Sequence, residues 1–314
     1  MNCLNIAILV LFFASEGCSF LHNPQFARTH HFDSRCDAIA SQQLGEFETL
    51  DIADTSNRNV RLYDFSSYDP IDYREMWNVQ KLLVDAHVDR LKVEFTKTKL
   101  PENQFISPDM YDQEEIRSHQ NIENQDLRVK SCDSIIFLQH NPVYTLGTAS
   151  DPEFVKLDEE VLNDLGIDLV RIERGGEVTY HGPGQLTVYP IFDLRGYKQD
   201  IHWYMRALEE AIIIALNNIG IDADREDDVT GVWVDHKKVA ALGVKVRRWC
   251  TFHGLAVNVD QRALGNFEGI VPCGLEGREV GCINDFLDEP ITVEDFSSHL
   301  KKAIEEVFQI QINR

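Results

Sequence analysis

The stretch RIERGGEVTYHGPGQLTVYPIFDLRG at residues 171–196 constrains the fold most strongly. Its two arms read as buried strands, but its centre holds Gly175, Gly176 and the Gly-Pro-Gly run at 182–184. Paired glycines let a backbone bend sharply and approach a ligand closely, and Gly-Pro-Gly favours a rigid turn. Between them lie a hydroxyl, an aromatic ring and a titratable ring, at Thr179, Tyr180 and His181. The residues alone favour a glycine-rich hairpin with one surface histidine, and a ligand-binding loop is the alternative. Neither a Walker pattern nor G-x-G-x-x-G is present, so no motif supports phosphate binding.

The rest of the chain predicts a mixed α/β or α+β fold in a single domain. Helical spacing and end signals predict helices at 72–95, 200–220 and 292–310. Asp72 can cap the first helix, and Thr292 with Asp295 forms a capping-box pattern before the last. Short apolar runs predict strands at 134–139, 143–147, 231–235, 238–246 and 252–259. Residues 96–133 are polar and contain two prolines, which is typical of a surface insertion.

The charge balance argues against nucleic acid as a partner. The chain of 314 residues has 52 acidic and 30 basic side chains, for a formal net charge of -22. Such a chain repels phosphate backbones. The densest basic cluster is KVRRW at 245–249. It is either a solvated face or a docking patch for an acidic partner.

The amino-terminal residues are typical of a targeting sequence. The apolar run IAILVLFFA at 6–14 is too short to span a bilayer, so 1–19 resembles a signal peptide. Residues 20–50 follow as a transit-like segment with Arg28, Arg35 and few acids. The pair resembles the bipartite presequences of algae with complex plastids. We therefore expect a plastid protein with no membrane contact in its mature form, 51–314. A mitochondrial or an ordinary secreted protein is the alternative.

Cys273 is a candidate nucleophile. It lies between Pro272 and Gly274 in GIVPCGLEG, so it is expected on a turn. The thiolate is the reactive form of a cysteine. A free cysteine has a pKa of about 8.5, so a nearby cation or helix terminus is needed to stabilise its thiolate. The alternative is a small buried residue. Cys282 lies close enough in sequence to suggest a disulfide or half of a metal site, but no paired C-x-x-C or histidine spacing supports a metal.

Lys238 is a candidate base. It begins the small apolar run KVAALGVKV, where desolvation would favour the neutral amine. The alternative is an ordinary lysine at a strand edge. Lys237 beside it leaves the choice between the two open on chemistry alone.

Taken together, these segments resemble one family. RGGEVTYHGPGQLTVYP is similar to the signature of the lipoyl/octanoyl transferases, the octanoyltransferases of lipoate biosynthesis. QHNPVYTLG, KVAALGVKV, FHGLAVNV and IVPCG resemble its other segments in the same order, over roughly residues 70–290 outside the insertion. One departure is Gly281-Cys282-Ile283, where the family commonly has Thr-Ser-Leu.

The resemblance implies a fold and a reaction. The fold is that of the biotin/lipoate protein ligase catalytic domain. The reaction moves octanoyl from the phosphopantetheine thioester of acyl carrier protein to a lysine of lipoyl domains. These domains belong to 2-oxoacid dehydrogenase complexes or to the H protein of glycine cleavage. Cys273 is the acylated residue, and Lys238 promotes its ionisation. No resident cofactor and no metal are implied.

The resemblance also implies a substrate pocket, built from the RGG-to-histidine segment and two backbone turns. Its residues are Arg174, Gly175, Gly176, Glu177, Val178, Thr179, Tyr180, His181, Ala241, Leu242, Gly243, Gly254, Leu255 and Ala256. The glycines are expected to let bare backbone line a narrow acyl tunnel.

Three other functions remain open. An ATP-using lipoate or biotin ligase shares the fold but does not need Cys273. A non-catalytic module that binds acyl carrier or lipoyl domains needs neither Cys273 nor Lys238. A cysteine hydrolase would pair Cys273 with His181 and release the acyl group to water.

Overall fold

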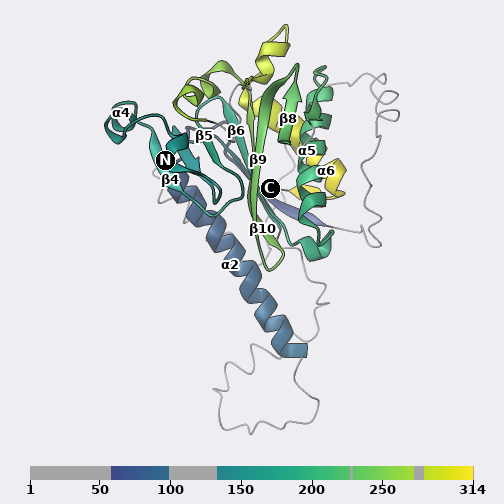
Figure 1. The fold of residues 1–314 in the computed structure, drawn as a ribbon. Helices are drawn as coiled ribbons and strands as arrows, with labels where there is room; N and C mark the ends of the chain where they lie inside the picture. Colours follow the sequence, from purple (N-terminus) through teal and green to yellow (C-terminus); the bar gives the residue numbers. More distant parts are fainter. Residues whose placement is uncertain (1–57, 99–132, 227–228, 272–278, 314) are drawn as a thin grey trace, which may run out of the picture.

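The computed structural model describes residues 58–98, 133–226, 229–271 and 279–313. In these residues, eight strands form a large sheet in the order β11–β1–β2–β6–β10–β9–β8–β7, and three form a small sheet in the order β4–β3–β5 (Figure 1). In the large sheet, β1 is parallel to β11 and β2, and the remaining neighbours are antiparallel. Its strands are β1 (Asn59–Asp64), β2 (Ser134–Leu138), β6 (Gln185–Ile191), β7 (Asp224–Glu226), β8 (Val229–Val234), β9 (Lys237–Arg247), β10 (Cys250–Asn258) and β11 (Gln311–Asn313). The small sheet comprises β3 (Val143–Leu146), β4 (Asp168–Arg171) and β5 (Val178–His181).

Helices cover both faces of the large sheet. The longer ones are α2 (Tyr73–Thr98), α5 (Ile201–Asn217) and α6 (Val293–Phe308), and α4 (Glu159–Asp164) is short. In Figure 1, α5 and α6 lie together on one side of the sheet and α2 crosses the opposite side. The mixed α/β class predicted from the sequence is therefore confirmed, with all three long helices at the predicted places.

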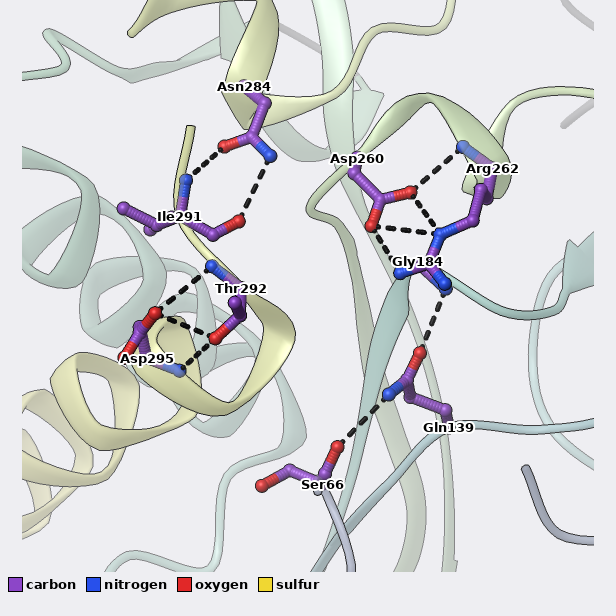
Figure 2. Close-up of polar contacts among 9 residues, drawn as sticks. All are labelled: Ser66, Gln139, Gly184, Asp260, Arg262, Asn284, Ile291, Thr292 and Asp295. Atoms are coloured by element: carbon purple, nitrogen blue, oxygen red, sulfur yellow. Dashed lines mark hydrogen bonds and ion pairs between the residues drawn. The ribbon is translucent and has the colours of Figure 1, made fainter. Parts of the chain in front are cut away.

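The predicted helix caps are present. Asp72 Oδ1 accepts a hydrogen bond from Glu75 N at 3.0 Å. At α6, Thr292 Oγ1 accepts from Asp295 N at 3.1 Å, and the Asp295 carboxylate accepts in return from Thr292 N at 3.2 Å (Figure 2). Each cap satisfies amide groups that the helix itself leaves unpaired, which stabilises the helix start by about 1 kcal/mol.

An aromatic cluster fixes α5 and α6 on the sheet. The ring of Phe308, on α6, lies 5.4–6.0 Å from the rings of four neighbours on α5 and on the segment between β6 and α5. These are Phe192, Tyr197, Trp203 and Tyr204. Aromatic pairs at such distances add about 0.5–1.5 kcal/mol each beyond their burial. The cluster joins α5 and α6 through ring contacts.

The glycine-rich stretch is not a hairpin, contrary to the simplest interpretation of its residues. Its arms, β4 and β6, belong to different sheets, and β5 between them pairs antiparallel with β3. The turn before β6 is held from two sides (Figure 2). Gly184 N donates to Gln139 Oε1 at 2.9 Å, and Gly184 O accepts from Asp260 N at 3.2 Å. These tertiary bonds, which no local pattern encodes, direct the stretch across both sheets.

Several predictions fall outside the described residues. They are the signal-like segment 1–19, the transit-like segment 20–50, all but the ends of the insertion 96–133, and Cys273. Helix α2 extends to Thr98, into the first residues assigned to the insertion. Among the residues that the structure describes, no helix is long and apolar enough to cross a membrane.

Candidate active site

A cavity of about 510 Å³ lies between the RGG segment and the middle of β9 and β10. Sites for small molecules commonly have volumes of roughly 300–1,000 Å³. Its lining includes Lys238 and all but one of the predicted pocket residues, namely Arg174, Gly175, Gly176, Glu177, Val178, Thr179, His181, Ala241, Leu242, Gly243, Gly254, Leu255 and Ala256. The structure thus brings the RGG segment together with the two adjacent strands β9 and β10, which follow it by more than 50 residues.

Tyr180 is the predicted pocket residue that does not line the cavity. Successive side chains of a strand point to opposite faces, so Tyr180 lies on the other side of β5 from its two neighbours. Its hydroxyl accepts a hydrogen bond from Asn266 Nδ2 at 2.9 Å, and its ring lies 5.8 Å from Tyr144 and 5.6 Å from Phe267. Tyr180 therefore supports the cavity wall from behind instead of forming it.

Arg174 fixes the RGG segment to both sheets. Its Nη2 donates to Thr145 O at 2.8 Å and to Thr145 Oγ1 at 2.9 Å, on β3. The next residue, Gly175, donates its N–H to Val244 O on β9 at 3.0 Å. A Cβ at Gly243 would lie 3.0 Å from both Arg174 Cδ and Gly175 O. At this position the missing side chain makes room for the RGG segment, which differs from the expectation that it makes room for an acyl chain.

A chain of hydrogen bonds determines the tautomer of His181. Asn258 Nδ2 donates to Gly281 O at 3.0 Å, so Asn258 Oδ1 is free to accept from Gln185 Nε2, also at 3.0 Å. Gln185 Nε2 donates to Tyr180 O as well, which leaves Gln185 Oε1 as an acceptor. His181 Nδ1, 2.7 Å from that oxygen, must therefore carry the proton. The lone pair is on Nε2.

His181 is also held neutral. Burial lowers its pKa to about 3, and the nearby His140 contributes in the same direction. Burial likewise lowers the pKa of His140 to about 4. An imidazole with so low a pKa accepts a hydrogen bond at neutral pH but is a poor proton acceptor. His181 is suited to orienting a substrate N–H or O–H group, not to removing its proton.

Several cavity residues were not selected from the sequence. They are Tyr73, Ala149, Thr187, Tyr189, Ile201, Met205, Val229, Thr230, Val244 and His253. His253 stands directly before Gly254 in the FHGLAVNV segment, so that motif could have indicated it. Its φ of 57° interrupts the alternation of β10, which simple strand periodicity does not predict. Tyr73 and Ile201 come from the starts of two helices, and only the tertiary fold brings them to the cavity.

The structure separates the two adjacent lysines. Lys238 is 8% exposed and lines the cavity. The side chain of Lys237 is 41% exposed, and its Nζ lies 3.5 Å from Glu279 Oε2. The backbone of Lys238 accepts from Gly281 N at 3.0 Å and donates to Glu279 O at 2.9 Å. The chain that follows Cys273 in sequence is thus anchored on the strand that carries Lys238.

Cys282 has a structural role. Its thiol donates to Asp285 Oδ1 at 3.2 Å and takes the place of a capping hydroxyl at the start of a 3₁₀ turn, Ile283–Phe286. Burial, and then the Asp285 carboxylate, raise the pKa of this thiol to about 12. Of the cysteines described, Cys250 and Cys282 are both free thiols. Across the described ranges, no three His, Cys, Asp or Glu side chains are grouped so as to hold a metal ion.

Comparison with known proteins shows the family to which the chain is similar. The lipoyl protein ligase A/B catalytic domain matches residues 115–305. A chloroplastic octanoyltransferase of Arabidopsis thaliana is 44% identical over 311 residues, which cover 96% of each chain. An octanoyltransferase of Gloeobacter violaceus is 49% identical over 179 residues, covering 57% of this chain and 77% of its own.

Solved structures with a similar fold include two lipoate enzymes. A bipartite lipoate protein ligase of Thermoplasma acidophilum has a TM-score of 0.53 at 17% identity, covering 82% of this chain and 86% of its own. LipL1 of P. falciparum, in complex with lipoate, has a TM-score of 0.50 at 11% identity, covering 80% and 60%. At these identities the likeness establishes the fold, as the sequence resemblance implied.

Proposed function

The chain belongs to the lipoyl protein ligase A/B catalytic-domain family, and we propose that it is an octanoyltransferase that acts in protein lipoylation. The observation that carries this proposal is the 44% identity to a chloroplastic octanoyltransferase, which extends over 96% of both chains. The buried Lys238 in the wall of the cavity supports it.

The proposed reaction has two steps through a thioester on Cys273. In the first, the Cys273 thiolate attacks the octanoyl carbonyl of acyl carrier protein, the carrier's C–S bond breaks, and the carrier leaves as its thiol. In the second, the neutral ε-amine of a lipoyl-domain lysine attacks the new thioester, an amide forms, and Cys273 leaves as its thiolate. Lys238 is the proposed proton-transfer partner: it takes the proton of the Cys273 thiol, gives it to the sulfur of the leaving carrier, and takes up the proton that the attacking amine loses as the amide forms. Forming an amide from a thioester is downhill, so the reaction needs no ATP.

Two alternatives fit the site less well. A cysteine hydrolase with His181 as its base is disfavoured, because His181 is buried, donates from Nδ1 to Gln185 and has a pKa of about 3. A non-catalytic binding module has no use for a lysine that is 8% exposed in the wall of its cavity, since burying an ammonium group is costly. A ligase that uses ATP remains the rival that experiment must separate.

The test mixes purified mature protein with octanoyl-acyl carrier protein and a lipoyl domain, without ATP. We expect the lipoyl-domain lysine to become octanoylated, as measured by the mass of that domain and of its lysine peptide. Free octanoate with ATP and magnesium serves as the comparison. Modification only in that second mixture would assign the protein to the ligases, and release of free octanoate without amide would assign it to the hydrolases.

The KVRRW segment comprises the last residues of β9 and the turn to β10, and we propose it as the docking patch for acyl carrier protein, which is acidic. Lys245, Arg247 and Arg248 are exposed there. Arg247 is paired with Asp85 of α2, so reversing its charge would also break an internal ion pair. Arg248 lies at the turn, with a φ of 53°, and is the better position for a charge-reversal test of docking.

Arg248→Glu is expected to raise the KM for octanoyl-acyl carrier protein by about 5- to 30-fold at low salt, with little change in kcat, because charge complementarity mainly guides encounter. Lys302→Glu on α6 changes the net charge equally at an exposed position and is the matched control. Steady-state kinetics at two salt concentrations measure both variants. Equal KM values for Arg248→Glu and wild type at low salt would show that the carrier does not dock on this patch.

The plastid is the proposed compartment. The presequence-like composition of residues 1–50 and the chloroplastic relative support it. Imaging a fluorescent protein fused behind residues 1–50 tests it, and a signal in mitochondria would overturn it.

A further inference from the structure

The side chain of Lys238 lies directly against Gly231 of the neighbouring strand β8. A Cβ at Gly231 would lie 2.5 Å from Lys238 Cε and 3.2 Å from Lys238 Nζ. Non-bonded carbon atoms approach to about 3.5–4.0 Å, so the Lys238 side chain occupies part of that space. The backbone oxygen of Ala240 also lies 2.8 Å from this Cβ position. The φ of Gly231 is 145°, which side-chain-bearing residues rarely adopt. The side chain of Lys238 therefore packs directly against the backbone of Gly231.

A bulge beside Gly231 directs the same lysine. Val232 pairs with Ala240, but the next residue, Trp233, pairs with Lys238, so Val239 has no partner in β8. Bulges bend a strand and re-aim the side chains next to them. Here the ammonium group of Lys238 comes 5.7 Å from the centre of the Trp233 ring, within the range of a cation–π contact.

Glu209 on α5 fixes the backbone of Gly231 by a hydrogen bond. This carboxylate on α5 is 1% exposed, and its Oε1 accepts from Gly231 N at 3.0 Å. Its Oε2 accepts from Arg206 Nη1 at 2.8 Å and from Arg225 Nε at 3.1 Å. Burying a carboxylate is costly unless donors satisfy it, and here donors occupy both oxygens.

The chemistry of these contacts requires a carboxylate. A glutamine at 209 would accept with one atom only, and its NH₂ group would face either the Gly231 N–H or the two arginines. Arg206 is about half exposed and Arg225 mostly covered, so the arginines connect Glu209 to the protein surface. The arrangement links α5 to β8 at the residue under Lys238.

We propose that Glu209 and Gly231 are positioning residues for Lys238. Glu209 holds the Gly231 backbone, and Gly231, lacking a Cβ, leaves the space in which the lysine side chain reaches the cavity. We call Gly231 and Glu209 together the lysine seat. Its importance for catalysis rests on the proposed function, in which Lys238 transfers protons. The position of the lysine itself does not depend on that function and is measured separately.

The experiment reads the position of Lys238 through its reactivity. Trace acetylation with acetic anhydride, followed by fragment mass analysis, gives the labelling ratio of Lys238 to the exposed Lys237. The variants are Gly231→Ala and Glu209→Gln. Gly265→Ala is the matched control, because a Cβ there meets nothing within 4 Å.

We expect the Lys238-to-Lys237 ratio to rise about tenfold in both variants, a factor equivalent to about 1.4 kcal/mol, and to stay unchanged in Gly265→Ala. The rate of octanoyl-enzyme formation should fall in the same variants while the KM for the carrier stays the same. An unchanged ratio in folded variants would overturn the proposal. A changed ratio in a protein that transfers no octanoyl would overturn the proposed function and leave the seat intact.

A thermal-unfolding cycle covers the case in which Gly231→Ala folds poorly. If the added Cβ clashes with Lys238, the loss of Tm caused by Gly231→Ala should be smaller in a Lys238→Ala background. Equal losses of Tm in the two backgrounds would show that the lysine does not occupy the space over Gly231 and would overturn the proposal.

Discussion

Cys273→Ser is expected to lower the rate of octanoyl transfer to a lipoyl domain by on the order of 10³-fold or more, because a serine hydroxyl at neutral pH is a far weaker nucleophile than a thiolate. The measurement is the initial rate of amide formation from octanoyl-acyl carrier protein. Thermal unfolding accompanies it, to show that the variant is folded.

Cys282→Ser is the matched control for that variant. The Cys282 thiol donates to Asp285 and occupies a capping position, which a serine hydroxyl fills at least as well. Activity close to wild type is expected, with stability within about 1 kcal/mol. Full activity of Cys273→Ser, or loss of activity in Cys282→Ser alone, would reverse the roles assigned to the two thiols.

Lys238→Met is expected to lower the rate of the first acyl-transfer step by about 10²- to 10⁴-fold, the usual contribution of a positioned proton-transfer group. Methionine fits the length of the buried seat without an ammonium group, so packing over Gly231 should survive. Single-turnover formation of the octanoyl-enzyme measures the step directly.

The neighbouring lysine provides the control for this second prediction. Lys237 projects toward solvent and pairs with Glu279. Lys237→Met is expected to keep wild-type rates. If Lys237→Met were the slow variant and Lys238→Met the normal one, the assignment of the base would be wrong.

Much of the scaffold could be predicted from the sequence, because its signals are local. The capping residues Asp72 and Thr292 mark the starts of α2 and α6, and the apolar runs mark β2, β8, β9 and β10. The short edge strands β7 and β11 have too few residues to show a period. The strand β5 lies among glycines that favour a turn, and its pairing with β3 is a tertiary event.

The family motifs predicted which residues form the cavity wall. They did not predict the structural role that each residue has there. Gly243 reads as bare backbone for a ligand, yet the structure shows Arg174 and Gly175 in the space that a Cβ would take. Tyr180 reads as a wall residue, yet strand alternation turns it to the other side of β5. The burial of Glu209 could not be predicted from the sequence, because only the fold supplies the donors that allow it.

A covalent octanoyl intermediate on Cys273 is the defining step of the proposed reaction, and the intact mass of the protein reveals it. The purified protein is mixed with octanoyl-acyl carrier protein, without acceptor and without ATP. The covalent route predicts a single octanoyl adduct that is absent from Cys273→Ser and disappears when a lipoyl domain is added. No adduct on the wild-type chain, with lipoyl-domain modification only after ATP and free octanoate are supplied, would contradict it and make the protein a ligase.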